Sequence, residues 1–128
     1  MREGSTKPIV LIVEDEALIR MSAVDFLEDA GFATLQANNA PDACAIFASR
    51  DDIVAVFTDL EMGGAFDGLV LVREVHSKRP EVLVLVTSGR SSPLARTIPP
   101  DCAFLPKPYS PNEVTSALRD LPCRVIRF

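Results

Sequence analysis

Five short apolar runs, separated by stretches with helical periodicity, constrain the fold of this chain more than any other feature. The runs are rich in β-branched residues and predict strands at 8–13, 33–37, 53–58, 82–86 and 102–105. Because strands alternate with helices, the pattern predicts an α/β fold with a parallel sheet. The first, third and fourth runs are almost continuously apolar, which is typical of central strands covered by helices on both faces.

The segments between the strands carry helix signals. We expect helices at about 16–30, 40–49, 67–78 and 91–98, and a last helix from 111 to about 121. The predicted inward stripe of the first helix is Ile19, Ala23, Phe26 and Ala30, and Gly31 is placed to end it. Asn39 is placed to cap the second helix, and Ser110 with Glu113 predicts a capping box for the last. Prolines in and after 91–98 leave room there for at most two turns.

Length and composition indicate one domain without a membrane anchor. With 128 residues, we expect a single domain at 7–121 and short tails at 1–6 and 122–128. No apolar run approaches a membrane span, and the first run is too short for a signal peptide. The three cysteines lack disulfide or zinc spacing, which favours a cytoplasmic protein. A net charge of -5 argues against direct nucleic-acid binding.

Polar residues end several of the predicted strands. Glu14 and Asp15 follow the first run, Asp59 the third, Thr87 the fourth and Lys107 the fifth. In a parallel sheet these positions share the carboxyl edge, where open α/β sheets bind ligands. Three crowded carboxylates repel one another unless a cation lies between them, and hard oxygen ligands suit Mg²⁺. A carboxylate in such a site can attack phosphorus while the metal and the lysine neutralise the developing charge.

Five motifs in order give the chain a family resemblance. They are VEDE at 13–16, FTDLEM at 57–62, DG at 67–68, VTSG at 86–89 and FLPKPYS at 104–110. With them the chain resembles a response-regulator receiver domain of bacterial two-component signalling. The resemblance implies a flavodoxin-like (βα)5 three-layer sandwich with the parallel strand order 2-1-3-4-5.

The resemblance also implies a role for each acid. Asp59 would be the phosphoacceptor. Asp15 and Asp59 would bind Mg²⁺ directly, together with the backbone carbonyl of Glu61, while Glu14 would act through a bound water. Glu14 stands where an aspartate is commoner, and the loop from Asp59 to Asp67 is one residue longer than usual and contains two glycines.

Three further residues take roles from the same resemblance. Lys107 would pair with the phosphoryl oxygens and precede a cis peptide bond to Pro108. Thr87 would hydrogen-bond to the phosphoryl group once it has formed, and Phe104 would turn inward with it. The switched surface would consist of the short fourth helix, the fifth strand and the last helix.

The function that follows is that of a stand-alone response regulator. It would receive its phosphoryl group from a sensor histidine kinase or a phosphotransfer protein and then bind a downstream protein. Phosphotransfer and slow dephosphorylation would be self-catalysed, so the chain would not be an enzyme with a separate substrate. We expect no contact with a membrane or directly with nucleic acid.

Three other functions fit the sequence less well than this one. An FMN-binding module needs a Ser/Thr/Gly-rich phosphate loop after the first strand, where this chain has Glu14, Asp15 and Glu16. A haloacid-dehalogenase-like phosphatase carries its paired acids after the first strand, whereas here Asp59 and Glu61 follow the third. A receiver fold that has lost phosphorylation and acts only as an adaptor would not need the complete acceptor set.

Overall fold

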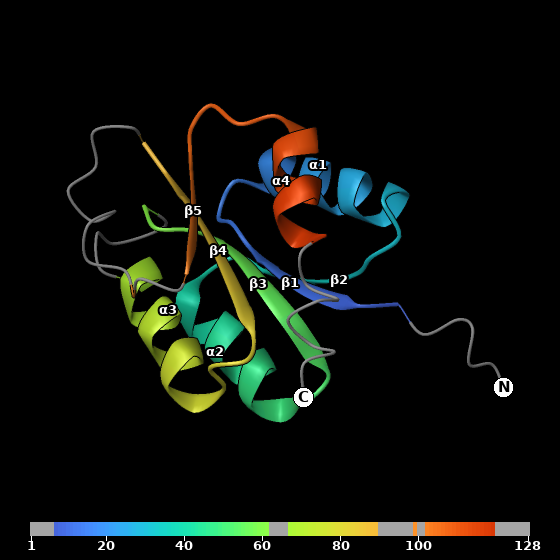
Figure 1. Cartoon of the computed structure of the whole chain (residues 1–128). Helices are drawn as coiled ribbons and strands as arrows, with labels where there is room; N and C mark the ends of the chain where they lie inside the picture. Colours follow the sequence, from blue (N-terminus) through green and yellow to red (C-terminus); the bar gives the residue numbers. More distant parts are fainter. Residues whose placement is uncertain (1–6, 62–66, 90–98, 100–101, 120–128) are drawn as a thin grey trace, which may run out of the picture.

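The computed structural model describes residues 7–61, 67–89, 99 and 102–119 (Figure 1). Its strands are β1 (Ile9–Val13), β2 (Ala33–Ala37), β3 (Ile53–Asp59), β4 (Leu83–Ser88) and β5 (Ala103–Pro106). Its helices are α1 (Ala17–Asp29), α2 (Ala40–Ser49), α3 (Asp67–Lys78) and α4 (Pro111–Leu118). The predicted helix at 91–98 and the predicted tails lie outside the described residues, and α4 is the helix predicted from 111.

The strands form one parallel sheet in the order β2-β1-β3-β4-β5, which confirms the predicted topology. Helices α2 and α3 cover one face of the sheet, and α1 and α4 cover the other (Figure 1). The register pairs Val13 with Thr58 and Asp59 with Thr87, so neighbouring strands end close to one another. The polar residues at the strand ends therefore share one edge.

Both faces of the sheet are buried, as the apolar runs predicted. In β1, Val10 and Ile12 belong to the core under α1 and α4, whereas Leu11 and Val13 belong to the core under α2 and α3. All four side chains are at most 1% exposed. Burying each one contributes about 1.5–3 kcal/mol relative to leaving it in water. This two-sided packing holds the ends of the central strands in place.

The predicted helix caps are confirmed, although α4 ends at Leu118 rather than near 121. The Asn39 side chain accepts a hydrogen bond from the Asp42 N–H at 2.7 Å and caps α2. In α4, Ser110 Oγ accepts from the Glu113 N–H at 3.2 Å, and Glu113 Oε1 accepts from the Ser110 N–H at 2.8 Å. Gly31 follows α1 with a φ of +101°, a left-handed conformation that favours glycine.

The buried stripe of α1 differs from the prediction in part. Ala23 is buried as expected, but its partner one turn later is Leu27, which was not predicted and is fully buried. Ile19 is 36% exposed because it lies at the carboxyl edge of the sheet, beside the cavity that Asp59 lines. Phe26 and Ala30 are only partly buried against the same core.

The first turn of α3 approaches the end of β3 very closely. A Cβ atom on Gly68 would lie 2.6 Å from the Leu60 Cα and 2.7 Å from the Asp59 carbonyl oxygen. Both are backbone atoms, so no flexible side chain can move aside. Only glycine fits here, and the contact holds the segment that carries Asp59 against α3.

We predict that Gly68→Ala lowers the free energy of unfolding by about 1–3 kcal/mol, because the added methyl group overpacks this contact. Urea unfolding measures the change. Val70→Ala is the matched control, since Val70 lies on the same helix, is 58% exposed and should shift stability by less than about 0.5 kcal/mol. A Gly68→Ala protein as stable as the control would contradict the close approach.

Candidate functional site

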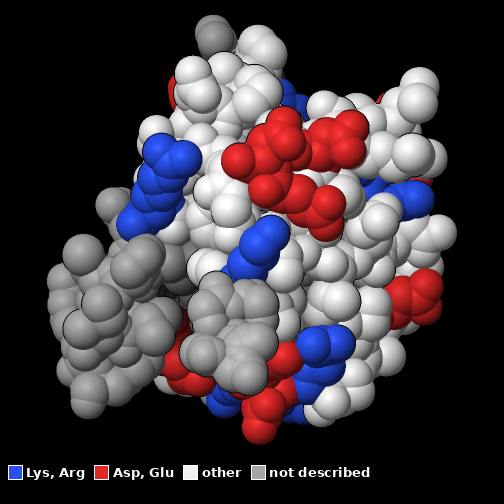
Figure 2. Space-filling model, turned by 90° about the vertical axis from the view of Figure 1, so that its right-hand side faces the viewer, with Lys and Arg blue, Asp and Glu red and all other residues white. Residues whose placement is uncertain are grey.

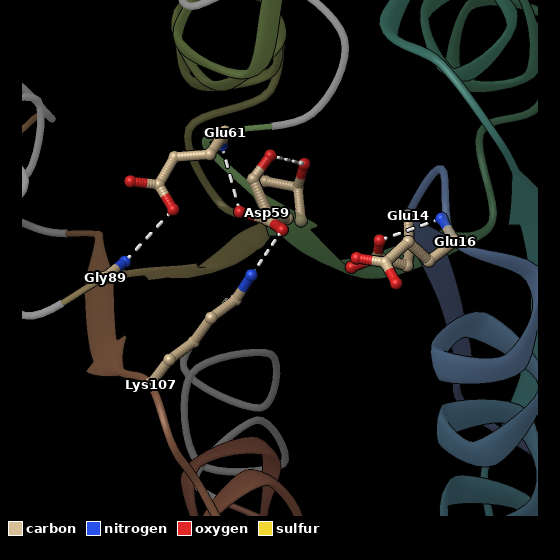
Figure 3. Close-up of polar contacts among 7 residues, drawn as sticks. Glu14, Glu16, Asp59, Glu61, Gly89 and Lys107 are labelled. Atoms are coloured by element: carbon tan, nitrogen blue, oxygen red, sulfur yellow. Dashed lines mark hydrogen bonds and ion pairs between the residues drawn. The ribbon is translucent and has the colours of Figure 1, made fainter.

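Asp59 and Lys107 form an ion pair at the carboxyl edge of the sheet (Figure 3). Asp59 is the last residue of β3, and its side chain is 6% exposed. Lys107 follows β5, is 34% exposed, and places Nζ 2.6 Å from Asp59 Oδ2. The Glu61 N–H donates to Asp59 Oδ1 at 2.9 Å. Asp59 therefore holds one strong contact on each carboxylate oxygen.

The backbone fixes Lys107 from the neighbouring strand. Its N–H donates to the Ser88 carbonyl at 2.9 Å, and the peptide bond to Pro108 is cis, as the resemblance implied. Because β4 lies between β3 and β5, the lysine side chain reaches across the end of β4 to meet Asp59. The ion pair thus joins strands that are not neighbours.

Glu14 and Asp15 lie on the other side of Asp59, at the end of β1. Glu14 is 5% exposed, whereas Asp15 is exposed. The Glu14 N–H donates to the Ala37 carbonyl at 3.1 Å, and Glu14 Oε2 accepts from the Glu16 N–H at 3.0 Å. Figure 3 shows the Glu14 carboxylate beside Asp59, opposite to the side from which Lys107 approaches.

The surroundings of Glu14, above all its burial, change its ionisation. Burial raises the pKa of Glu14 from 4.5 to about 7. The charge of Asp59 and a hydrogen bond with Asp15 add to the rise, while the Glu16 N–H and the charge of Lys107 oppose it. A buried carboxyl beside other acids is expected to behave in this way. Glu14 can lose its proton more easily if a cation joins the cluster.

The pKa of Lys107 is also raised, which in a lysine favours the charged form. Burial acts to lower the pKa of Lys107, but the hydrogen bond and the charge of Asp59 outweigh it, and the charges of Glu14 and Glu61 add to the effect. The pKa is therefore raised above its ordinary value. Lys107 stays protonated over the whole physiological range.

Two hydroxyl groups near the ion pair have no hydrogen-bond partner in this structure. They belong to Thr87 and Ser88, which are 2% and 0% exposed at the end of β4. Buried hydroxyl groups nearly always have a hydrogen-bond partner, and an oxygen-rich group bound at the site could accept hydrogen bonds from these two. Thr87 is paired in register with Asp59, and both line a narrow cavity of about 10 Å³.

The donor set fits a small, hard cation. Among the described residues, no three His, Cys, Asp or Glu side chains lie together closely enough to hold a metal ion by themselves. Mg²⁺ does not require such a group, since it keeps several waters and takes one or two carboxylates. The carboxylates of Asp15 and Asp59 and the carbonyl of Glu61 suit that pattern.

The remaining predicted residues lie around this centre. Phe104 is in β5, partly buried against the core under α2 and α3. The Glu61 side chain points away from Asp59, and its Oε1 accepts from the Gly89 N–H at 3.2 Å (Figure 3). Glu61 thus connects the segments that follow β3 and β4.

Tyr109 is a site neighbour that was not predicted. Its ring packs edge-on against Phe57 with the centroids 5.7 Å apart, and it lines the narrow cavity together with Asp59. Burial raises the pKa of the Tyr109 hydroxyl, and the charge of Glu14 adds to the rise. Its position directly after Lys107-Pro108 was the available signal, but the side-chain direction depends on the fold.

We predict that, without Mg²⁺, the free energy of unfolding falls as the pH rises from about 4.5 to about 7. The pKa of Glu14 is higher in the folded protein than in the unfolded chain. The stability it contributes is therefore complete below the unfolded value and is lost as the pH passes the folded one. The loss should be on the order of 2 kcal/mol.

Urea unfolding in EDTA at about pH 5 and about pH 8 measures this loss. Glu14→Gln removes the titrating proton while keeping the size of the side chain, so the variant should show a flatter pH dependence. Equal pH dependence in the two proteins would contradict the raised pKa.

Comparisons with known proteins point to one family. The family model of the response regulator receiver domain matches residues 10–119. The transcriptional regulatory protein AruR of Pseudomonas aeruginosa is 32% identical over 125 residues, which cover 92% of this chain and 50% of AruR. The sensor kinase CckA of Brucella abortus is 29% identical over 115 residues, which cover 88% of this chain and 12% of CckA. The chain thus spans half or less of these two relatives.

Solved structures show the same fold. A response regulator receiver protein from Sinorhizobium medicae superposes with a TM-score of 0.84 and 25% identity, over 92% of this chain and 97% of that one. No helix in the described part of the chain is long and apolar enough to cross a membrane. The family match covers all five strands except the first residue of β1, and it includes every residue of the predicted site. This chain belongs to the response regulator receiver domain family of two-component signalling.

Proposed function

We propose that this protein is a phosphorylation-activated response regulator in which Asp59 accepts the phosphoryl group. The observation that carries the proposal is the arrangement around Asp59: a buried carboxylate with Lys107 at 2.6 Å and the partnerless Thr87 hydroxyl on the adjacent strand. A purely structural ion pair would not account for the hydroxyl. The domain that performs the reaction would be 7–121.

The proposed reaction transfers a phosphoryl group from a phosphohistidine to aspartate. A carboxylate oxygen of Asp59 forms a bond to phosphorus as the phosphorus–nitrogen bond of the donor breaks, and the leaving imidazole takes up a proton. Lys107 neutralises charge on the phosphoryl oxygens, and the Thr87 hydroxyl donates a hydrogen bond to one of them. Slow hydrolysis of the acyl phosphate would return Asp59 to its starting state, without a separate enzyme.

Mg²⁺ would neutralise part of the negative charge shared by the acids and the phosphoryl oxygens. Asp15 and Asp59 would bind it directly with the Glu61 carbonyl, and Glu14 would contact it through a water. This assignment is supported by the oxygen-only donor set.

The phosphoryl donor would be a sensor histidine kinase or a phosphotransfer protein, and the read-out would be contact with a downstream protein. Phe104 and Thr87 would connect the site to the surface made by 91–98, β5 and α4. On the face shown in Figure 2, Lys and Arg side chains lie singly rather than in a stripe, while Asp and Glu side chains form a patch. This charge pattern supports a protein partner rather than nucleic acid.

Asp59→Asn should abolish phosphorylation by acetyl phosphate and Mg²⁺, because the amide oxygen is a poor nucleophile. The fold should remain, since Lys107 is one-third exposed and can turn to water. Intact mass spectrometry measures the gain of one phosphoryl group. Asp25→Asn, at an exposed position of α1, is the matched control and should be labelled like the wild type. Undiminished labelling of Asp59→Asn would refute the assignment.

Mg²⁺ should raise the melting temperature of the wild type, because a ligand that binds only the folded state stabilises it by mass action. Asp15→Ala should lose this gain. At a Mg²⁺ concentration 100 times the dissociation constant, the stabilisation would be about 2.7 kcal/mol. Thermal unfolding with and without Mg²⁺ compares the two proteins, and equal stabilisation of both would exclude Asp15 as a ligand.

A further inference from the structure

Arg20, in the first turn of α1, contacts the acidic strand end from outside the site. Its Nη1 donates to the Glu14 carbonyl oxygen at 2.9 Å. That carbonyl belongs to the peptide bond between Glu14 and Asp15, so the contact bears directly on the orientation of the Asp15 backbone. No sequence motif had indicated a role for Arg20.

The guanidinium is itself held by β2. Arg20 Nε donates to Gln36 Oε1 at 3.1 Å, and Gln36 is paired in register with Ile12 of β1. Two N–H groups of the planar Arg20 guanidinium therefore connect the Gln36 side chain of β2 to the Glu14 backbone at the end of β1. The polar end of β2 contributes no charge to the site, but through Gln36 it orients Arg20.

The two other hydrogen-bonding groups of Glu14 show why this contact matters. The Glu14 N–H is taken by the Ala37 carbonyl, and the Glu14 carboxylate accepts from the Glu16 N–H. The Glu14 carbonyl completes the set by accepting from Arg20. These three contacts hold the turn that presents Asp15, and Arg20 supplies the one among them that comes from a side chain of another element.

We infer that Arg20, oriented by Gln36, is a positioning residue for the acidic pair that binds Mg²⁺ at this site. The inference rests on the proposed function, since it assigns Arg20 a role toward the same metal. Groups that orient the direct ligands commonly control metal affinity by 10–100-fold. Here the action passes through the backbone of Glu14 to Asp15.

The geometry predicts that Mg²⁺ binding depends on the shape of the Arg20 guanidinium as well as on its charge. A guanidinium offers donors in a rigid fork, whereas a lysine ammonium is a single point charge on a flexible stem. Lysine at position 20 would keep the charge near the acids but could not hold Gln36 and the Glu14 carbonyl in the same plane. Arg20→Lys therefore distinguishes the loss of the two hydrogen bonds from the loss of positive charge.

The test measures Mg²⁺ affinity in the whole chain. Tyr109 is the single tyrosine in a chain without tryptophan, and it lies beside Glu14 and Asp59, so its fluorescence reports on the site during a Mg²⁺ titration. Arg20→Ala and Arg20→Lys should each weaken Mg²⁺ binding about 10-fold. Gln36→Ala should weaken it in the same direction by less, since it leaves the Arg20 contact to Glu14 possible.

A second readout separates positioning from catalysis and from general stability. At saturating Mg²⁺, the rate of phosphorylation by acetyl phosphate should return to that of the wild type in all three variants. Their melting temperatures without Mg²⁺ should change no more than that of Arg50→Ala. Arg50 is a matched control because it is a hydrogen-bonded arginine that pairs with Asp52 near the start of β3, at the opposite edge of the sheet.

Each contrary outcome has a definite meaning. Unchanged Mg²⁺ affinity in Arg20→Ala, or full recovery in Arg20→Lys, would overturn the inference while leaving the proposed function intact. A rate that stays low at saturating Mg²⁺ would also overturn it, because Arg20 would then act in the chemical step. A wild type with no response to Mg²⁺ by fluorescence or melting would refute the metal site itself, and the inference with it.

Discussion

The burial of negatively charged side chains is the constraint on which the rest of this structure depends. Asp59 and Glu14 are each 5% exposed, and a carboxylate buried to that extent is very unfavourable unless it is paired and hydrogen-bonded. Lys107 supplies the compensating charge for Asp59, whereas Glu14 takes a raised pKa. Lys107 reaches Asp59 from the end of β5, across the end of β4.

The apolar sheet makes this arrangement rigid. Because both faces of β1, β3 and β4 are buried, the strand ends cannot shift without disturbing two cores at once. Gly68 adds a backbone contact that presses α3 onto the end of β3. Asp59 is therefore positioned by the most buried part of the molecule.

The site also contains polar groups whose burial is unfavourable. Thr87 and Ser88 hold buried hydroxyl groups without partners in this structure, and unsatisfied polar groups in a low-dielectric environment reduce stability. Under the proposed function, a cation and a phosphoryl group would offset the negative charge of the acids and accept hydrogen bonds from these hydroxyl groups. Departures from ideal packing of this kind are expected where a protein carries its function.

Much of this protein could be predicted from local sequence. The bounds of β2, α2 and α3 matched the predicted ranges, because helix caps and short apolar runs act through neighbouring residues. The acids, the threonine and the lysine of the site were identified because polar residues interrupt those runs at equivalent ends. The strand order came from the family resemblance, and the structure confirmed it.

Only the tertiary structure decided how these residues meet. Ile19 proved partly exposed and Leu27 fully buried, because the end of the sheet determines which turn of α1 has a partner. The pKa of Glu14 and the link from Gln36 through Arg20 to the Glu14 carbonyl depend on contacts between separate elements. Local sequence determined which groups stand at the strand ends, whereas desolvation and long-range hydrogen bonds, which exist only once the chain has packed, decided their charge and orientation.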